Sequence, residues 1–295
     1  MAGVPFDQLS GQIWYNGEFV EWGDAKVHVL THGLHYASAV FEGERAYGGE
    51  IFHLTKHTER LHRSARILGF EIPYSVEEID EACRETLKRQ GLINAYVRPI
   101  AWRGSEMMGV SAQNNRINVA IAVWDWPSYF DPEQKMKGIR LDIAQWKRPD
   151  PATAPCEAKA AGLYMICTLS KHAAEAKGYA DALMMDYRGQ VAEATGANVF
   201  FTKDGELHTP TPDSFLDGIT RQTVIELAER RQIKVNERVI MPDEMADFEE
   251  CFITGSAAEV TPVSEIGPYT FQPGQISKAM MDDYMAEVTP GKASA

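Results

Sequence analysis

The stretch EAKAAGLYMI, residues 157–166, places Lys159 among small residues and puts an aromatic hydroxyl, Tyr164, shortly after it. Lysine side chains usually lie in solvent beside polar neighbours. A buried lysine amine has a lowered pKa and becomes a nucleophile towards carbonyl groups. The small neighbours of Lys159 would leave room for a flat ring against the backbone. This pattern favours a reactive lysine; a solvated loop lysine is the alternative while Lys159 is considered alone.

The composition indicates a globular protein. The chain has 295 residues, of which 44% are hydrophobic and 24% charged, enough for two domains. The formal net charge is −13 and basic stretches are short, so we expect no nucleic-acid partner and no membrane surface. No apolar run is long enough to span a membrane. The first residues, MAGVPFDQLSGQ, lack the regions of a secretory signal, and the four cysteines form no CxxC pair. We expect free thiols and a cytoplasmic protein.

Turn and capping signals outline the N-terminal half. Asn16-Gly17 and Gly48-Gly49 each lie between strand-like flanks and predict hairpins. Leu61, Ala65 and Leu68 share one face of a predicted helix. A second helix is predicted to begin at the capping box 75–78 and to end at Gly91. The stretch KVHVLTHGLHY predicts a strand followed by a loop.

The second half also mixes helices with short strands. A helix is predicted over roughly 164–177 and another over 220–231, with strands before and after each. There is no regular alternation of strand and helix, and GxGxxG and GxxxxGK[ST] motifs are absent, which argues against a Rossmann or P-loop nucleotide site. We predict an α/β fold of α+β type with two mixed domains: residues 1–130, a linker at 131–138, and a larger domain at 139–295 that carries Lys159.

Three further sites each admit a functional and a structural interpretation. Gly218, Ile219 and Thr220 open a helix, and a helix start binds phosphate well, although a plain cap is the commoner case. Gly255 and Ser256 follow a strand and allow close backbone approach, or form an ordinary turn. Glu193 lies among small and apolar residues, where a carboxylate needs a cation or donor unless it faces solvent.

Together these sites are what pyridoxal 5'-phosphate requires: a lysine, a phosphate-binding helix start, a carboxylate for the ring nitrogen, and a tyrosine for the ring oxygen. Lys159, Tyr164, Glu193, the 218–220 turn and the 255–256 turn occur in an order that resembles the fold-type IV, class IV aminotransferases. The resemblance covers nearly the whole chain. It implies that the cofactor is held between the two domains.

Within that family the chain resembles the branched-chain amino acid aminotransferases. The stretch KVHVLTHGLHYASAVFEGERAY is similar to their N-terminal signature, and AYVRP and MMGV are similar to their substrate-side segments. The resemblance implies that Arg60 holds the cofactor phosphate. The substrate-side residues that it implies are Tyr36, Phe41, Tyr96, Arg98, Val110, Trp126, Tyr129 and Ala257. The chain departs from the family at Leu163, at Glu44, where isoleucine is usual, and in EATGAN.

The implied reaction is transamination of L-leucine, L-isoleucine and L-valine with 2-oxoglutarate, by a ping-pong route through an internal aldimine on Lys159. The family also implies at least a homodimer in which each active site borrows a loop, for which 108–110 is our candidate. Rival activities in the family are those of D-amino acid aminotransferase, (R)-amine transaminase and aminodeoxychorismate lyase. A non-catalytic relative that only binds a ligand is an alternative from another class.

Two residue groups keep structural alternatives. Arg98 is expected on the same strand face as Tyr96, where it either helps to bind the distal carboxylate of glutamate or closes an ion pair with Glu42 or Glu44. The three histidines at positions 28, 32 and 35 have a metal-like spacing, which would suit a metal-dependent hydrolase. No carboxylate or cysteine completes a ligand set beside them, so we predict no metal site.

Overall fold

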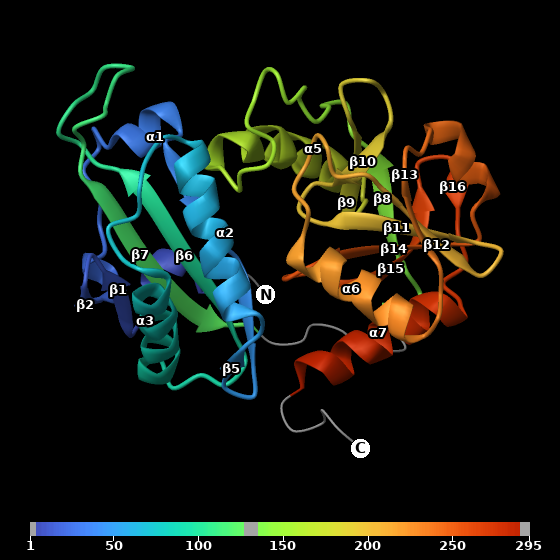
Figure 1. Cartoon of the computed structure of the whole chain (residues 1–295), viewed down its shortest axis with the longest axis horizontal. Helices are drawn as coiled ribbons and strands as arrows, with labels where there is room; N and C mark the ends of the chain where they lie inside the picture. Colours follow the sequence, from blue (N-terminus) through green and yellow to red (C-terminus); the bar gives the residue numbers. More distant parts are fainter. Residues whose placement is uncertain (1–3, 127–134, 290–295) are drawn as a thin grey trace. The chain divides into compact units, whose positions relative to one another are not determined.

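The computed structural model describes residues 4–126 and 135–289, which form two compact units. The N-terminal unit contains residues 4–126 and a returning segment, Ala158–Gly162, and the C-terminal unit contains residues 135–157 and 163–289. Each unit combines helices with a sheet (Figure 1), which confirms the predicted mixed α/β class. Residues 131–134 of the predicted linker and Tyr129 lie outside the described residues.

The sheet of the N-terminal unit is antiparallel in every described pairing. Its strand order is β2-β1-β7-β6-β4-β5, and β3 pairs with β6. The strands are β1 (Gln12–Tyr15), β2 (Glu18–Glu21), β3 (Ala39–Phe41), β4 (Glu44–Tyr47), β5 (Glu50–Ile51), β6 (Ala95–Arg103) and β7 (Ile117–Asp125). Asn16 and Gly17 both have positive φ and join β1 to β2, so the predicted hairpin is confirmed.

Helices α2 (Leu54–Ile67) and α3 (Val76–Arg89) cover one face of this sheet (Figure 1). Ser75 accepts a hydrogen bond from the Glu78 backbone N–H, and the Glu78 carboxylate accepts one from the Ser75 backbone N–H, which confirms the predicted capping box. Apolar side chains of both helices, including Leu61 and Ile79, pack with strand residues such as Val97 into one core. This core fixes where α2 places its polar residues.

The nine strands described in the C-terminal unit form a sheet that closes on itself. Strand β10 pairs with both β9 and β11, so the path β10-β9-β8-β15-β14-β11 makes a ring, and β12, β13 and β16 extend it. The strands are β8 (Ile139–Ile143), β9 (Asp181–Met185), β10 (Val191–Ala194), β11 (Asn198–Lys203), β12 (Glu206–Pro210), β13 (Val235–Arg238), β14 (Glu250–Gly255), β15 (Glu259–Ile266) and β16 (Tyr269–Thr270). Buried side chains such as Leu183, Val199 and Val263 form the core inside it.

In the described part of the C-terminal unit, three α-helices pack on the outside of this ring (Figure 1). Helix α5 (Met165–Ala176) contacts β8 and β9, whereas α6 (Ile219–Arg230) and α7 (Gln275–Val288) contact each other and β14. The predicted helices over 164–177 and 220–231 are therefore confirmed. No helix among the described residues has the length and apolar character needed to cross a membrane.

The prediction of a strand followed by a loop in KVHVLTHGLHY is wrong. Residues 25–31 form no strand, and His32–Tyr36 form a short helix, α1. Hydrogen bonds from distant segments decide this, because the His32 backbone N–H donates to Gly104 O and the His32 ring bonds to Gly109 O. The alternation of apolar residues along this stretch gives no information about hydrogen bonds to distant segments.

Candidate active site

The segment that carries Lys159 returns to the N-terminal unit, although the sequence placed it in the C-terminal domain. The Lys159 backbone N–H donates to Ser64 Oγ at 3.0 Å, and the Phe41 backbone N–H donates to Lys159 O at 3.2 Å. Val40 and Ala160 form an isolated β-bridge. The Lys159 amine lies 4.9 Å from the centre of the Phe41 ring, a predicted substrate-side residue. These backbone contacts fix the lysine beside β3 and α2.

Arg60 is held by a buried carboxylate. Its Nε donates to Glu42 Oε1 at 2.7 Å and its Nη2 donates to Glu42 Oε2 at 2.8 Å. His57 Nδ1 lies 2.7 Å from the same Oε2. Burial tends to raise the pKa of Glu42, but Arg60 and His57 together hold that pKa well below its usual range. Glu42 is therefore an anion with two partners, and sequence reasoning found neither its role nor that of His57.

Glu44 is a second buried carboxyl group in this region, and its surroundings differ from those of Glu42. Neither of its oxygens has a hydrogen-bond partner among the described residues. Burial raises its pKa well above the usual value, the charges of Glu42 and Asp80 raise it further, and Arg60 opposes them. Such surroundings favour the protonated, neutral form of the Glu44 carboxyl group. An isoleucine at this position would place no polar atoms here.

The Glu44→Ile variant should be more stable than the wild type, and its advantage should grow with pH. Below the usual carboxyl pKa both states of the wild type keep the proton. As the pH rises towards the raised folded pKa, the unfolded chain ionises while the folded chain does not. This lowers the wild-type free energy of unfolding by up to about 1.4 kcal/mol per pH unit. Denaturant unfolding between about pH 5 and pH 8 measures the difference.

The Glu44→Gln variant is the matched control, because it keeps a polar side chain that cannot ionise. The stability difference between Glu44→Gln and Glu44→Ile should not depend on pH. Glu44→Gln should still be the less stable of the two, because it buries a polar group. A constant gap between wild type and Glu44→Ile across this pH range would contradict the assignment of a protonated Glu44.

Four of the predicted substrate-side residues come together in the N-terminal unit. The Arg98 guanidinium lies 4.8 Å from the Phe41 ring centre, and its Nη2 donates to the Tyr96 hydroxyl at 3.2 Å. The Tyr96 and Trp126 rings are 5.0 Å apart. The Nε of Arg98 is buried and has no hydrogen-bond partner among the described residues. Glu42 bonds to Arg60 and His57, so the expected alternative of an Arg98 ion pair with Glu42 finds no support.

Tyr36 and Val110 belong to a second cluster of the same unit. The Tyr36 hydroxyl donates to Met108 O at 3.4 Å, and its ring stacks on His32. The side chain of Val110 is 84% exposed. The three histidines of this region bond to the backbone: His28 with Leu30, His32 with Gly109 and His35 with Val29. Within the described ranges, no group of three or more potential metal-ligating side chains is arranged to hold a metal ion.

Glu193 of the C-terminal unit is buried and paired with an arginine. Arg148 Nε lies 3.3 Å from Glu193 Oε1, and Asn198 Nδ2 donates to Glu193 Oε2 at 3.3 Å. Burial lowers the pKa of Arg148, but Glu193 raises it to a net value above the ordinary one. Glu193 therefore has a guanidinium and an amide N–H beside its two carboxylate oxygens. Arg148 was missed because it occurs in KRPDP, where a proline-rich loop suggests a solvated side chain.

The two predicted turns lie close to Glu193. Gly218 is the N-cap of α6, and a Cβ at this position would lie 2.2 Å from Asn198 Oδ1, so a side chain here would displace the amide that bonds to Glu193. A Cβ on Gly255 would lie 3.2 Å from Gly196 O, in the loop that follows Glu193. Ile219 and Thr220 are buried in the first turn of α6. The helix start, the carboxylate and the 255–256 turn therefore form one region of the C-terminal unit.

Tyr164 is half-buried at the junction of a short 3₁₀ turn and α5. Ser256 and Ala257 lie in the turn after β14, and Ala257 is exposed. These positions suit residues that contact a ligand from one side.

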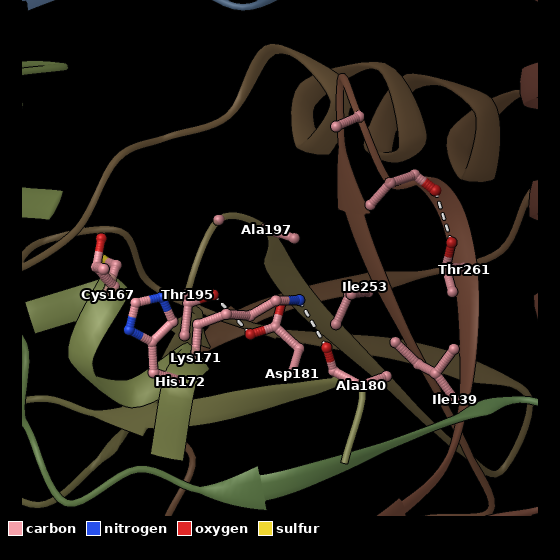
Figure 2. Close-up of a pocket in the computed structure, with 14 residues that line it drawn as sticks. Ile139, Cys167, Lys171, His172, Ala180, Asp181, Thr195, Ala197, Ile253 and Thr261 are labelled. Carbon is pink, nitrogen blue, oxygen red and sulfur yellow. Dashed lines mark hydrogen bonds and ion pairs between the residues drawn. The ribbon is translucent and has the colours of Figure 1, made fainter. Parts of the chain in front are cut away.

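A pocket of about 550 Å³ opens at the end of the closed sheet (Figure 2), and Ala257 is part of its wall. Apolar side chains such as Ile253 and Ala197 form much of its surface. Figure 2 shows partners for Lys171 and Asp181: Lys171 Nζ donates to Ala180 O at 2.6 Å, and Thr195 Oγ1 donates to Asp181 Oδ1 at 2.6 Å. The pocket therefore offers apolar space rather than an uncompensated charge.

Comparisons with known proteins agree with these observations. The family model described as amino-transferase class IV matches residues 39–266. The branched-chain-amino-acid aminotransferase of Pseudomonas aeruginosa is 43% identical over 260 residues, which are 87% of this chain and 85% of that protein. The crystal structure of an Escherichia coli branched-chain amino acid aminotransferase has a TM-score of 0.92 and 36% identity, and the match covers 97% of each chain.

The crystal structure of another branched-chain amino acid aminotransferase, solved with pyridoxamine 5'-phosphate, has a TM-score of 0.93 and 38% identity over 95% of both chains. The matched range includes Arg60, Lys159, Glu193 and Gly255. The chain belongs to the class IV aminotransferase family, among the branched-chain-amino-acid aminotransferases.

Proposed function

We propose that this protein transfers the amino group of L-leucine, L-isoleucine or L-valine to 2-oxoglutarate with pyridoxal 5'-phosphate as cofactor. The observation that carries the proposal is the buried Glu193 carboxylate, which contacts Arg148 and Asn198 and is located beside the start of α6. The relatives named above are branched-chain-amino-acid aminotransferases, which supports the substrate class.

The residues present fit this cofactor chemically. The Glu193 carboxylate contacts Arg148 and Asn198, and a carboxylate is an acceptor suited to a protonated ring nitrogen. The first turn of α6 offers backbone N–H groups to a phosphate, and Gly218 allows its close approach. Gly255 and Ser256 add a second turn for the phosphate side, and Arg60 supplies a guanidinium.

When bound, the cofactor supplies an electron sink for the bond that breaks at the substrate Cα. The amine of Lys159 would hold the cofactor covalently and would take up and return the proton of the substrate Cα. Glu193 would accept a hydrogen bond from the protonated ring nitrogen, and the Tyr164 hydroxyl would orient the ring oxygen. Backbone donors at Ser256 and Ala257 bind the substrate α-carboxylate, and the rings of Phe41, Tyr96 and Trp126 surround its side chain.

A substrate panel tests this proposal. Loaded protein with 2-oxoglutarate should form glutamate from L-leucine, L-isoleucine and L-valine, and much more slowly from L-alanine or L-aspartate, which fill an apolar pocket poorly. D-Leucine should not react. Preferred use of D-amino acids or of (R)-amines would assign one of the rival activities within the family.

The Arg98→Met variant should separate the two amino-group donors. The orphaned Arg98 Nε lies in an aromatic setting and can meet the distal carboxylate of glutamate. Loss of a hydrogen bond to a charged group should weaken the binding of glutamate and 2-oxoglutarate by roughly 1.5–3 kcal/mol. The leucine and valine half-reactions should stay nearly unchanged, because their side chains offer no acceptor. Single-turnover rates of the two half-reactions measure this, and equal losses would assign Arg98 to the structure of the pocket.

We also propose that two copies of the chain form the active enzyme. Apolar side chains around α1 and the 107–110 loop are exposed, among them Val29 at 68%, Leu34 at 66% and Val110 at 84%. Hydrogen bonds from His32 and Tyr36 to Gly109 and Met108 join these two segments. Such a patch marks a contact surface, and the 108–110 loop is our candidate for the loop lent to a partner copy. Sedimentation of the loaded protein as a monomer would contradict this.

The compartment is a further part of the proposal. All four cysteines are buried free thiols. This supports the cytoplasm, where thiols stay reduced.

A further inference from the structure

Glu42, His57 and Arg60 form a buried, hydrogen-bonded group in the N-terminal unit. Its contacts constrain the orientation of Arg60 more than a single ion pair would. Glu42 is fully buried, and the side chains of His57 and Arg60 are 3% and 8% exposed. The carboxylate contacts the guanidinium through both of its oxygens, at 2.7 and 2.8 Å. A two-point contact of this kind fixes the plane and direction of an arginine, which a single contact does not.

His57 fixes the carboxylate in turn. Burial lowers the pKa of His57, Glu42 raises it, and Arg60 and Lys159 lower it, with a net shift below the ordinary value. The imidazole is therefore neutral, and its Nδ1–H donates to the Glu42 carboxylate, which accepts only. The Gly43 backbone N–H also approaches Glu42 Oε2 at 3.3 Å. The carboxylate thus has donors on several sides.

The neighbouring acid does not compete for the guanidinium. Neither Glu44 oxygen has a hydrogen-bond partner among the described residues, and burial favours the neutral form of Glu44, whereas both Glu42 oxygens bond to Arg60. His57 and Arg60 both belong to α2, and Glu42 lies between β3 and β4. The three residues consequently connect the helix to the strand segment that also contacts the Lys159 backbone.

The contact also determines which edge of Arg60 faces away from the carboxylate. Glu42 occupies the edge formed by Nε and Nη2, so the opposite edge of the planar guanidinium, at Nη1, points in a fixed direction. An arginine that is oriented before binding loses less conformational freedom when it meets its anion. The benefit is specific to an anionic group on the ligand.

We propose that Glu42 and His57 are positioning residues that orient Arg60 towards the cofactor phosphate and so make this enzyme discriminate pyridoxal 5'-phosphate from unphosphorylated pyridoxal. This inference rests on the proposed function, because it assigns the phosphate to Arg60. Neither residue contacts the cofactor; both act through the guanidinium.

Cofactor binding to the cofactor-free full chain tests the inference. Pyridoxal 5'-phosphate and pyridoxal are titrated separately, and the ratio of their dissociation constants is the readout. Glu42→Gln should raise the constant for pyridoxal 5'-phosphate by about tenfold and leave that for pyridoxal within about twofold. Glu59→Gln, an exposed acid beside Arg60 on α2, is the matched control and should change neither. Competition by inorganic phosphate should weaken in parallel in Glu42→Gln.

Two histidine variants keep the test decisive if Glu42→Gln does not fold. His57→Leu removes the donor to Glu42 and should reduce the discrimination by about threefold, whereas His57→Asn, whose amide nitrogen can replace Nδ1, should restore it. Equal weakening of both ligands, or an unchanged ratio in all three variants, would overturn the inference. An Arg60→Met variant with an unchanged ratio would instead remove the phosphate assignment on which it rests. Wild-type chain that binds neither ligand would contradict the proposed function itself.

Discussion

The Lys159→Ala variant should lose transamination by at least about a thousandfold, because this side chain is both the covalent anchor of the cofactor and the group that moves the proton. The visible absorbance of the loaded protein should disappear. Pyridoxal 5'-phosphate should still bind without a covalent bond, since Arg60 and the start of α6 do not depend on the lysine side chain. Borohydride reduction of the wild type, followed by peptide mapping, should place the label on Lys159.

Lys171 and Lys177 provide the controls. Lys171 donates to Ala180 O, and Lys177 pairs with Asp142, so both amines already have structural partners. Alanine variants of either lysine should keep the label and the activity. A label on Lys171 or Lys177 in the wild type would show that the reactive lysine has been assigned wrongly.

The Glu193→Gln variant should form the loaded protein normally but turn over about a hundredfold more slowly. The amide keeps the shape of the side chain and loses the charge that holds a proton on the ring nitrogen, an interaction worth on the order of a few kcal/mol. The loss is increased by Arg148, whose positive charge would then lie near the ring nitrogen without the compensating carboxylate. Single-turnover rates with L-leucine measure the effect.

Glu265→Gln is the matched control for this variant. Glu265 also pairs with an arginine, Arg140, in the same sheet, but the pair is partly exposed. Its replacement should leave turnover unchanged. Turnover of Glu193→Gln close to the wild-type rate would mean that another group protonates the ring nitrogen.

Much of the local structure could be predicted because its causes are local. The Asn16-Gly17 hairpin, the capping box at Ser75 and the end of α3 before Gly91 each depend on residues within one turn. The spacing of apolar residues is sufficient to predict α2, because its buried side chains recur at helical intervals. In contrast, α1 and the placement of Lys159 depend on hydrogen bonds to Gly104 and Ser64, which no local pattern encodes.

In the candidate site, too, features with local causes could be predicted, whereas those that depend on distant segments could not. Glu193 could be singled out because an acid among small and apolar residues needs a partner. The identity of that partner, Arg148, depends on how a proline-rich loop folds back, and its sequence neighbourhood resembles a solvated turn. Glu42 and His57 were missed for a similar reason: their bond joins the segment after β3 to α2, and neither residue is unusual in its own segment.

The amino-group transfer from L-leucine, observed as a single half-reaction, tests the central claim most directly. Loaded protein is mixed with L-leucine without any 2-oxo acid, and the cofactor absorbance and the released product are followed together. The account predicts that the visible absorbance is lost as a stoichiometric amount of 4-methyl-2-oxopentanoate appears, and that 2-oxoglutarate then restores the absorbance while glutamate forms. An unchanged spectrum with L-leucine, or a faster change with D-leucine, would contradict it.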